Sequence, residues 1–390
     1  MKKIGLLPKL IIAIIIGILI GAYAPEWVVA IAATFNGIFG NFLGFAIPLI
    51  IVGFVAPGIG DLGDGAGKLL AITAGIAYFS TILAGTASYF ASSIIFPTFL
   101  KAGSLLTDAT NPEEALLAPL FKVDMPPVFG VMTALLIAFI IGLGIAAVKT
   151  DALKNVMHEF QKIIELVISK IIIPLLPFHI LGIFANMTYA GQVATILSVF
   201  SRVFIMIIAL HLITLIIQFL IAGTYAGGNP FRLLKNMIPA YFTAIGTQSS
   251  AATIPVTLAQ TKKNGIKDDI ADFVIPLCAT IHLSGSTITL VACSLAILML
   301  NGITMSYIEI LPFILMLGVT MVAAPGVPGG AVMAALGLLE TMLGFSQPML
   351  SLMIALYIAQ DSFGTATNVT GDGAIALIVN KISGNKLIKN

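Results

Sequence analysis

Charged side chains are scarce in this sequence. Aspartate, glutamate, lysine and arginine together make up 9% of the 390 residues, whereas hydrophobic residues make up 59%. A soluble globular domain carries about 25% charged residues, so this composition argues against a soluble domain and predicts a chain embedded in a lipid bilayer. The few basic residues are dispersed and form no stripe, so no nucleic-acid partner is expected.

Cysteine and histidine are also rare, and their spacing indicates no metal centre or disulfide. Cys278 and Cys293 lie in one apolar segment, which is typical of small buried side chains. The four histidines lack a ligand spacing such as H-x-x-x-H, and we interpret His179 and His211 as packing or interhelical hydrogen-bonding residues. A phosphate-binding G-x-x-x-x-G-K loop is missing. We therefore expect no ATP hydrolysis, no enzyme activity and no cofactor.

Long apolar runs are abundant instead. A run of roughly 17–25 residues can cross a bilayer as a helix, and we interpret the first run as an uncleaved helix rather than a signal peptide. Two later segments, 270–300 and 346–380, are long enough to cross but are interrupted by polar or glycine-rich sequence. The pattern predicts an all-α polytopic membrane protein with eight transmembrane helices. The six earlier runs are 9–31, 36–59, 68–96, 128–148, 163–186 and 194–224.

A shorter, repeated pattern precedes each of the two interrupted segments. The stretches "TQSSAATIP" (Thr247–Pro255) and "AAPGVPGG" (Ala323–Gly330) place small residues between apolar arms of about 10–15 residues, too short to cross. Non-helical backbone at membrane depth must line a cavity or be buried in protein. Two such segments in corresponding positions indicate a transporter built from inverted repeats, with its binding site at the breaks. Two ordinary helices kinked by Gly and Pro are the alternative.

Lysine and arginine are distributed unequally between the two sides of this predicted topology. Only Lys101 and Lys122 fall on one side, and nearly all the others fall on the opposite side, which also holds both termini. By the positive-inside rule that side is cytoplasmic. We therefore expect a multi-pass protein of the cell inner (plasma) membrane with both termini in the cytoplasm.

Four polar residues form a stripe within the last apolar segment. Asp361, Thr365, Asn368 and Asp372 are spaced 4, 3 and 4 apart, so they share one face of a helix. The two aspartates lie about 16 Å apart along the axis, which argues against an aspartyl protease, whose carboxylates share a proton at about 3 Å. Asp361 can pair with an ammonium group and Asp372 with a small cation. Hydrogen bonding between helices is the structural alternative.

Three short motifs, in their order along the chain, resemble those of one transporter family. "SSAATIP" (Ser249–Pro255), "PGVPGG" (Pro325–Gly330) and "NVTGD" (Asn368–Asp372) are similar to the dicarboxylate/amino acid:cation symporters, the glutamate-transporter-like proteins. The resemblance implies a homotrimer of eight-helix subunits with two re-entrant hairpins, in which a transport domain slides against a scaffold like an elevator. It also implies a division of the chain: scaffold helices 1–2 at 1–67, transport-domain helix 3 at 68–100, a loop and scaffold helices 4–5 at 101–194, transport-domain helix 6 at 195–230, and the transport-domain core at 231–390.

The same resemblance implies a role for particular residues. Asp361 would bind the substrate's α-amino group, and Asn368 with the backbone at the first hairpin's tip would bind its α-carboxylate. A sodium ion would be held by Asp372 and by backbone carbonyls, with a second sodium near the carbonyl of Thr280. The implied substrate-binding set is Ser249, Ser250, Ser286, Gly326, Val327, Gly329, Asp361, Gly364, Thr365 and Asn368, and the carbonyl ligands of the first sodium are Cys278, His282 and Asn368.

Four positions depart from the family's pattern. Gly364 stands where carriers of acidic amino acids keep an arginine, and Gln248 replaces another arginine in the first hairpin. Ser284 and His282 replace an aspartate and an asparagine of a further sodium site. A neutral substrate is therefore expected, and His282 either couples protons or fills the vacated ion site as a neutral residue.

We therefore expect a secondary active symporter that imports a small, neutral amino acid with sodium, and possibly protons, by an elevator mechanism. The expected partners are the amino acid, the lipid bilayer and two further copies of the chain. Three alternatives stay open: a symporter of dicarboxylates or acidic amino acids, a non-transporting membrane sensor, and an intramembrane aspartyl protease.

Overall fold

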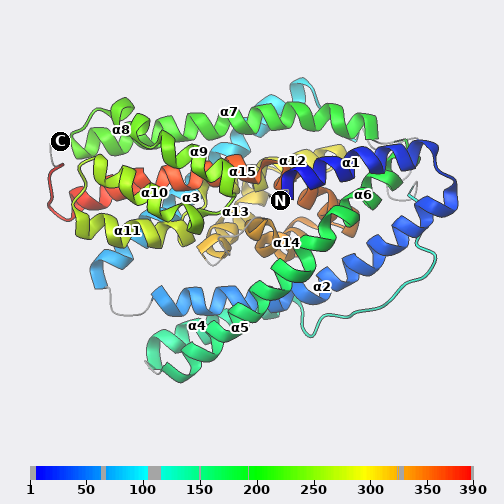
Figure 1. Cartoon of the computed structure of the whole chain (residues 1–390), viewed down its shortest axis with the longest axis horizontal. Coiled ribbons are helices and arrows are strands. Elements are labelled where there is room, and N and C mark those ends of the chain that lie inside the picture. The colour runs from blue at the N-terminus through cyan, green and yellow to red at the C-terminus, as the bar shows by residue number, and fades with distance from the viewer. Residues whose placement is uncertain are drawn as a thin grey trace, which may run out of the picture.

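The protein is built from helices throughout its described part (Figure 1). The computed structural model describes residues 6–62, 67–103, 116–148, 151–191, 193–322, 324 and 329–387. The elements are α1 (Leu6–Tyr23), α2 (Glu26–Leu62), α3 (Gly67–Ile95), the 3-10 turn η1 (Phe96–Thr98), α4 (Val131–Val148), α5 (Asp151–Val167), the π-helical turn η3 (Ile168–Ile172), α6 (Ile173–Tyr189), α7 (Val193–Ala226), α8 (Pro230–Asn236), α9 (Ile238–Thr247), α10 (Ser250–Lys263), α11 (Asp268–Ile281), α12 (Ser284–Leu300), α13 (Tyr307–Val322), α14 (Gly330–Leu343) and α15 (Gln347–Ile382).

These elements confirm the predicted all-α membrane fold. Five helical stretches of the described chain are long and apolar enough to cross a membrane. Two of them are compound: α5, η3 and α6 run on from Asp151 to Tyr189, and α11 with α12 spans Asp268–Leu300. The arms of the two predicted hairpins are also present, as α9 with α10 and α13 with α14, each 10 to 16 residues long.

Two details differ from the sequence-based expectation. The first two helices separate at Ala24–Pro25 rather than between residues 31 and 36, because Pro25 lacks the N–H that would continue α1 and is instead suited to the start of α2. In addition, the segment 346–380 is not interrupted. It forms α15, one continuous helix of 36 residues, and its polar side chains bond sideways to neighbouring elements.

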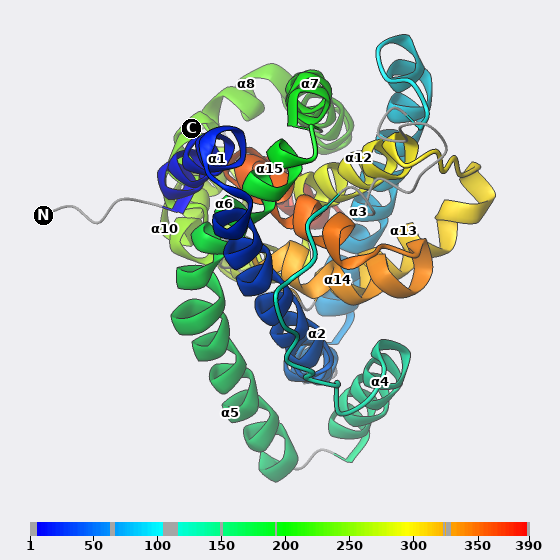
Figure 2. The ribbon, with the colours of Figure 1, turned by 90° about the vertical axis from the view of Figure 1, so that its right-hand side faces the viewer.

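The helices pack as two interlocking groups. In the first group α2 contacts α4, α5 and α6, and α1 contacts α6; Figure 2 shows α4 and α5 in the lower part of the view, on either side of α2. Helix α15 lies at the centre of the other group, in contact with α7, α9, α11 and α12. The close α1–α6 contact depends on Gly17 and Gly21, one turn apart, because a Cβ at either would overlap backbone atoms of α6.

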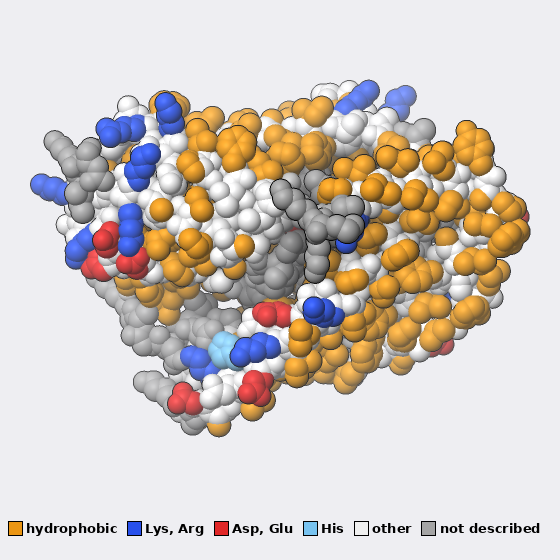
Figure 3. Space-filling view, viewed as in Figure 1, with side chains coloured by type: hydrophobic (Ala, Val, Ile, Leu, Met, Phe, Trp, Pro, Cys, Tyr) orange, Lys and Arg blue, Asp and Glu red, His pale blue; other side chains and the backbone are white. Residues whose placement is uncertain are grey.

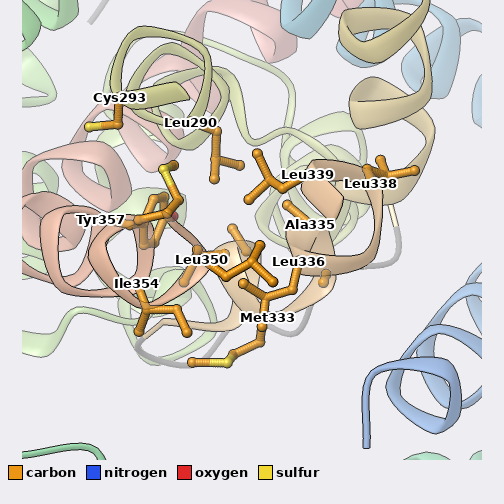
Figure 4. Close-up of a cluster of buried hydrophobic side chains, with 14 of the residues drawn as sticks. Leu290, Cys293, Met333, Ala335, Leu336, Leu338, Leu339, Leu350, Ile354 and Tyr357 are labelled. Carbon is orange, nitrogen blue, oxygen red and sulfur yellow. The ribbon is translucent and has the colours of Figure 1, made fainter. Parts of the chain in front are cut away.

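The largest hydrophobic cluster of the described residues includes α12, α14 and the first turns of α15. Figure 4 shows Leu290 of α12, Leu336 and Leu339 of α14, and Leu350 and Ile354 of α15 directed into one cluster. Apolar residues also cover much of the visible surface, whereas lysine and arginine gather at the end that holds α8 and the C terminus (Figure 3). An outer surface of this kind suits contact with lipid, and the basic end suits water or lipid headgroups.

Candidate functional site

The candidate site forms where the break between α11 and α12 meets α15. Helix α11 ends at Ile281, and His282 has an extended backbone before α12 begins at Ser284. Asn368 of α15 covers the new helix start: its Oδ1 accepts hydrogen bonds from the N–H groups of Gly285 (2.8 Å) and Ser286 (3.3 Å). Its Nδ2 donates to Ser286 Oγ at 3.0 Å. The predicted pair of Asn368 and Ser286 therefore lies in direct contact.

Two glycines bring α12 and α15 unusually close at this point. A Cβ on Gly285 would overlap the carbonyl oxygen of Gly364 and lie 2.7 Å from Thr367 Cβ. A Cβ on Gly364 would meet Ser286 N at 3.5 Å, an ordinary contact. Gly285 is thus required by the packing, whereas Gly364 leaves room for a small side chain.

Asp361 lies on the same face of α15, about two turns from Asn368. Its side chain is buried, and its Oδ2 accepts a hydrogen bond from the N–H of Gly329 at 2.7 Å, at the start of α14. Tyr357 and Thr365 lie beside the carboxylate. All these neighbours are uncharged, so a buried negative charge here has only dipoles to stabilise it. An ammonium group is the partner that such a site favours.

The first hairpin approaches α15 from another side. Ala244 of α9 packs against Ala366 and Val369 of α15. At the tip, Gln248 has a φ of 53°, the only non-glycine positive φ among the described residues, a conformation that costs of order 1–3 kcal/mol. Ser249 then caps α10 by accepting a bond from Ala252 N (3.3 Å), and Ser250 is buried. The N–H of Ser249 in turn donates to Thr247 Oγ1 at 3.4 Å, so the tip is held in a defined turn.

Asp372 lies at the other end of the stripe in a separate polar network. Its Oδ1 lies 2.9 Å from His282 Nδ1, and both side chains are buried. The second carboxylate oxygen, Oδ2, is buried without a hydrogen-bond partner. Such an orphan acceptor is uncommon in a native structure, and a small cation would satisfy it.

The network continues from His282 into α3 and α7. His282 Nε2 lies 3.1 Å from Ser80 Oγ, which accepts a bond from Gln218 Nε2 at 3.1 Å. Gln218 Nε2 also lies 3.4 Å from Ser284 Oγ. His282 is therefore bonded on both ring nitrogens, to Asp372 and to Ser80, and it joins α11, α15 and α3.

Most of the predicted site residues with described positions fall into these two groups. The first group surrounds the α12 start and the second hairpin, and contains Ser286, Asn368, Gly364, Asp361, Thr365 and Gly329. The second group belongs to the polar network, and contains Asp372, His282 and Cys278, with Cys278 near the carboxylate of Asp372. The carbonyl of Cys278 already accepts the N–H of His282. Thr280 has an exposed side chain that donates to Leu277 O. Gly326 and Val327 lie outside the described residues.

Three contributing residues, Tyr357, Ser80 and Gln218, were not predicted from the sequence. Tyr357 precedes Asp361 by one helical turn, and this spacing places it on the polar face of α15. Ser80 and Gln218 are polar residues inside otherwise apolar helices, which is the sequence feature that could have identified them. The interhelical role predicted for His211 is confirmed, since its Nε2 lies 2.9 Å from Gly285 O. The same holds for His179, with Nδ1 near the side-chain amide of Asn36 and Nε2 3.1 Å from Ser351 Oγ.

Comparison with known proteins places this geometry in context. A model of the sodium:dicarboxylate symporter family matches residues 6–382. The chain is 29% identical over 298 residues to excitatory amino acid transporter 2 of Rattus norvegicus, covering 73% of this chain and 50% of that protein. It is 27% identical over 343 residues to the serine/threonine transporter SstT of Streptococcus suis (strain 05ZYH33), covering 85% of this chain and 94% of that one. The chain thus spans about half the length of the excitatory amino acid transporters that it matches.

Proposed function

The chain belongs to the sodium:dicarboxylate symporter family, and we propose that it is a secondary active symporter importing a small neutral amino acid together with sodium. The observation that carries the substrate class is the neutral surrounding of Asp361. Its carboxylate has Gly329 N–H, Tyr357 and Thr365 for neighbours, and Gly364 stands at the position one turn closer to Asn368. This site offers a counter-charge to an ammonium group and none to a second carboxylate.

The proposed binding mode uses the ends of the zwitterion separately. Asp361 takes the α-amino group, replacing the Gly329 N–H that it accepts in this structure. The Asn368 amide and the backbone at Ser249–Ser250 take the α-carboxylate, with Ser286 and Thr365 beside it. Gly329, Gly326 and Val327 belong to the second hairpin, which we propose closes over the bound substrate as a gate. Exchange of the Gly329 bond for the substrate bond links occupancy of the site to the position of the second hairpin.

Sodium is the proposed coupling ion, and Asp372 its charged ligand. The unpartnered Oδ2 of Asp372 supports this role, with carbonyl oxygens of Cys278, His282 and Asn368 as further ligands. The carbonyl of Thr280 is the proposed ligand of a second sodium. The hydrogen bonds of His282 to Asp372 and Ser80 favour its role as a residue that fills a vacated ion site, and proton coupling through His282 is an outcome that the test below distinguishes.

The proposed movement is that of an elevator. Residues 68–100, 195–230 and 231–390 would form the transport domain, and 1–67 and 101–194 the scaffold, within a homotrimer. The packing of α1, α2, α4, α5 and α6 against one another supports this division. The proposed location is the inner (plasma) membrane with both termini in the cytoplasm, which the gathering of basic residues at the α8 end supports.

Transport by purified protein in liposomes tests the proposal. Labelled serine, alanine, threonine, aspartate and succinate are offered under separate sodium and pH gradients. Sodium-driven uptake of a neutral amino acid supports it. Uptake of aspartate or succinate alone would instead indicate an acidic substrate, and binding without uptake would indicate a sensor.

A further inference from the structure

A second pocket lies far from the α12 start, at the end of the molecule that holds α8 and the C terminus. It has a volume of about 560 Å³, within the range of ordinary small-ligand pockets. Four basic side chains line it: Arg232 of α8, Lys263 at the end of α10, Lys381 in the last turn of α15, and Lys386 just beyond that helix. The lining contains no carboxylate among the described residues.

The acidic residues nearby are already paired with other lysines. Asp272 lies 2.7 Å from Lys262 Nζ, and Asp269 lies 2.9 Å from Lys267 Nζ. The hydrogen bond that Lys262 donates to Asp272 raises the pKa of Lys262 above its ordinary value. No ion pair involving Arg232, Lys263, Lys381 or Lys386 occurs within the described chain. The pocket therefore concentrates uncompensated positive charge, and Figure 3 shows basic side chains gathered at this end.

An apolar groove lies along α7 and α15, two helices that also contribute residues to the basic pocket. It has a volume of about 380 Å³ and lies between α3, α7 and α15. On α7 the groove reaches Ile221, five residues before Ala226, which lines the basic pocket. On α15 it reaches Ile378, one turn before Lys381. At 1.5 Å per residue, the two sites are about 5–8 Å apart along the helix axes.

The exposure of the groove also indicates what covers it. Phe79, Ile217 and Ile221 line it with side chains that are half or more exposed, and Tyr225 and Phe231 stand exposed beside the basic pocket. Aromatic residues next to basic ones are typical of a membrane–water interface. The occupant must therefore be anionic at one end and apolar along its length.

We propose that the basic pocket and the groove together bind one anionic phospholipid. The phosphodiester headgroup lies among Arg232, Lys263 and Lys381, and an acyl chain lies along Ile221 and Ile378. Basic pockets between transmembrane helices on the cytoplasmic side are suited to such headgroups. This site is independent of the proposed substrate, so its test stands whether or not serine is transported.

Binding to defined lipids tests the proposal. The full chain, purified in detergent, is titrated with short-chain phosphatidylglycerol and phosphatidylcholine, with melting temperature and native mass spectrometry as readouts. Phosphatidylglycerol should bind selectively. The R232Q/K263Q/K381Q variant should bind it about a hundredfold more weakly, since each basic side chain near an anionic surface contributes about fivefold. The matched control K9Q/K154Q/K162Q removes the same charge outside the pocket and should bind normally.

Two further arms separate a lipid from free phosphate. Ile221→Trp fills the groove and should weaken binding of phosphatidylglycerol, whereas Ile205→Trp, on the same helix outside the groove and 69% exposed, should not. Inorganic phosphate at millimolar concentration should not compete. Three outcomes would each overturn the proposal. They are equal binding of the two lipids, normal phosphatidylglycerol binding by an R232Q/K263Q/K381Q variant that elutes like the unmodified protein in size-exclusion chromatography, and full competition by phosphate.

Discussion

Asp361 and Asp372 share one face of one helix but have different partners. Asp361 accepts a backbone N–H from Gly329, whereas Asp372 faces His282 with one oxygen and has no partner for the other. The spacing of the polar stripe predicted their common face, and the structure adds what each carboxylate contacts. This difference supports the assignment of the substrate to Asp361 and of the cation to Asp372.

We expect Asp372→Asn to weaken the affinity for the coupling ion by tenfold or more, because an amide keeps the shape of the side chain but removes the charge that a cation requires. The sodium concentration at half-maximal uptake measures this. Asp361→Asn is the control, and should impair substrate binding more than ion affinity. An unchanged sodium dependence in the Asp372 variant would contradict the assignment.

Substrate charge is the second prediction at this scale. Aspartate should bind at least a hundredfold more weakly than serine or alanine, a difference of about 2.7 kcal/mol, because a side-chain carboxylate buried beside Gly364 would have no cationic partner. Competition against serine uptake measures the ratio. Comparable inhibition by aspartate or succinate would refute this interpretation of Gly364.

Gly285 and Gly364 form a matched pair for a third test. Gly285→Ala should abolish or strongly reduce uptake and destabilise the protein by about 1–3 kcal/mol, because its Cβ would overlap the Gly364 carbonyl. Gly364→Ala should fold and transport, since its Cβ finds ordinary contact distances. The melting temperature and the uptake rate of both variants test this prediction. Equal losses in the two variants would show that the close α12–α15 contact at Gly285 does not explain the effect.

At the scale of elements, the α1–α6 contact was not predicted, because a pair of glycines in an apolar run does not identify its partner. Gly21→Leu should separate the two helices and lower the melting temperature in detergent, since the added side chain meets Ala185 and Thr188. Gly44→Leu, in α2, is the control, because a Cβ there meets no atom within 4 Å. A normal melting temperature in Gly21→Leu would show that α1 can move aside.

Elements differ in how well the sequence predicts them. Apolar length predicted the crossing helices, and small residues between short arms predicted the hairpins. Polarity misled in one place: "QDSFGTATNVTGD" suggested an interruption, yet α15 stays helical. Asn368 and Asp361 accept N–H groups from other segments and leave the backbone of α15 to its own hydrogen bonds. The partner of Asp361 lies 32 residues away in sequence and that of Asn368 lies 83 residues away, so local patterns cannot reveal either.

For the whole molecule, the prediction concerns stoichiometry. We expect two sodium ions or fewer per substrate, because Ser284 cannot supply a carboxylate and His282 fills the space between Asp372 and Ser80. Reversal potentials of uptake in vesicles under imposed gradients measure the number. Three sodium ions per substrate would refute it, and normal pH dependence in His282→Gln would remove protons from the coupling.

The uninterrupted course of α15 has a mechanical consequence. At 1.5 Å per residue its 36 residues form a rod about 54 Å long, which carries both the proposed amino-acid contact at Asp361 and the proposed ion contact at Asp372. The distance between positions 361 and 372 along the axis cannot change without breaking helical hydrogen bonds, so any movement of α15 displaces both proposed contacts together. Slippage, in which one species crosses without the other, would then require α15 to move while one of the proposed contacts is empty. Because Gly329 bonds to Asp361 at the start of α14, we expect the second hairpin to determine whether α15 can move with the Asp361 contact empty.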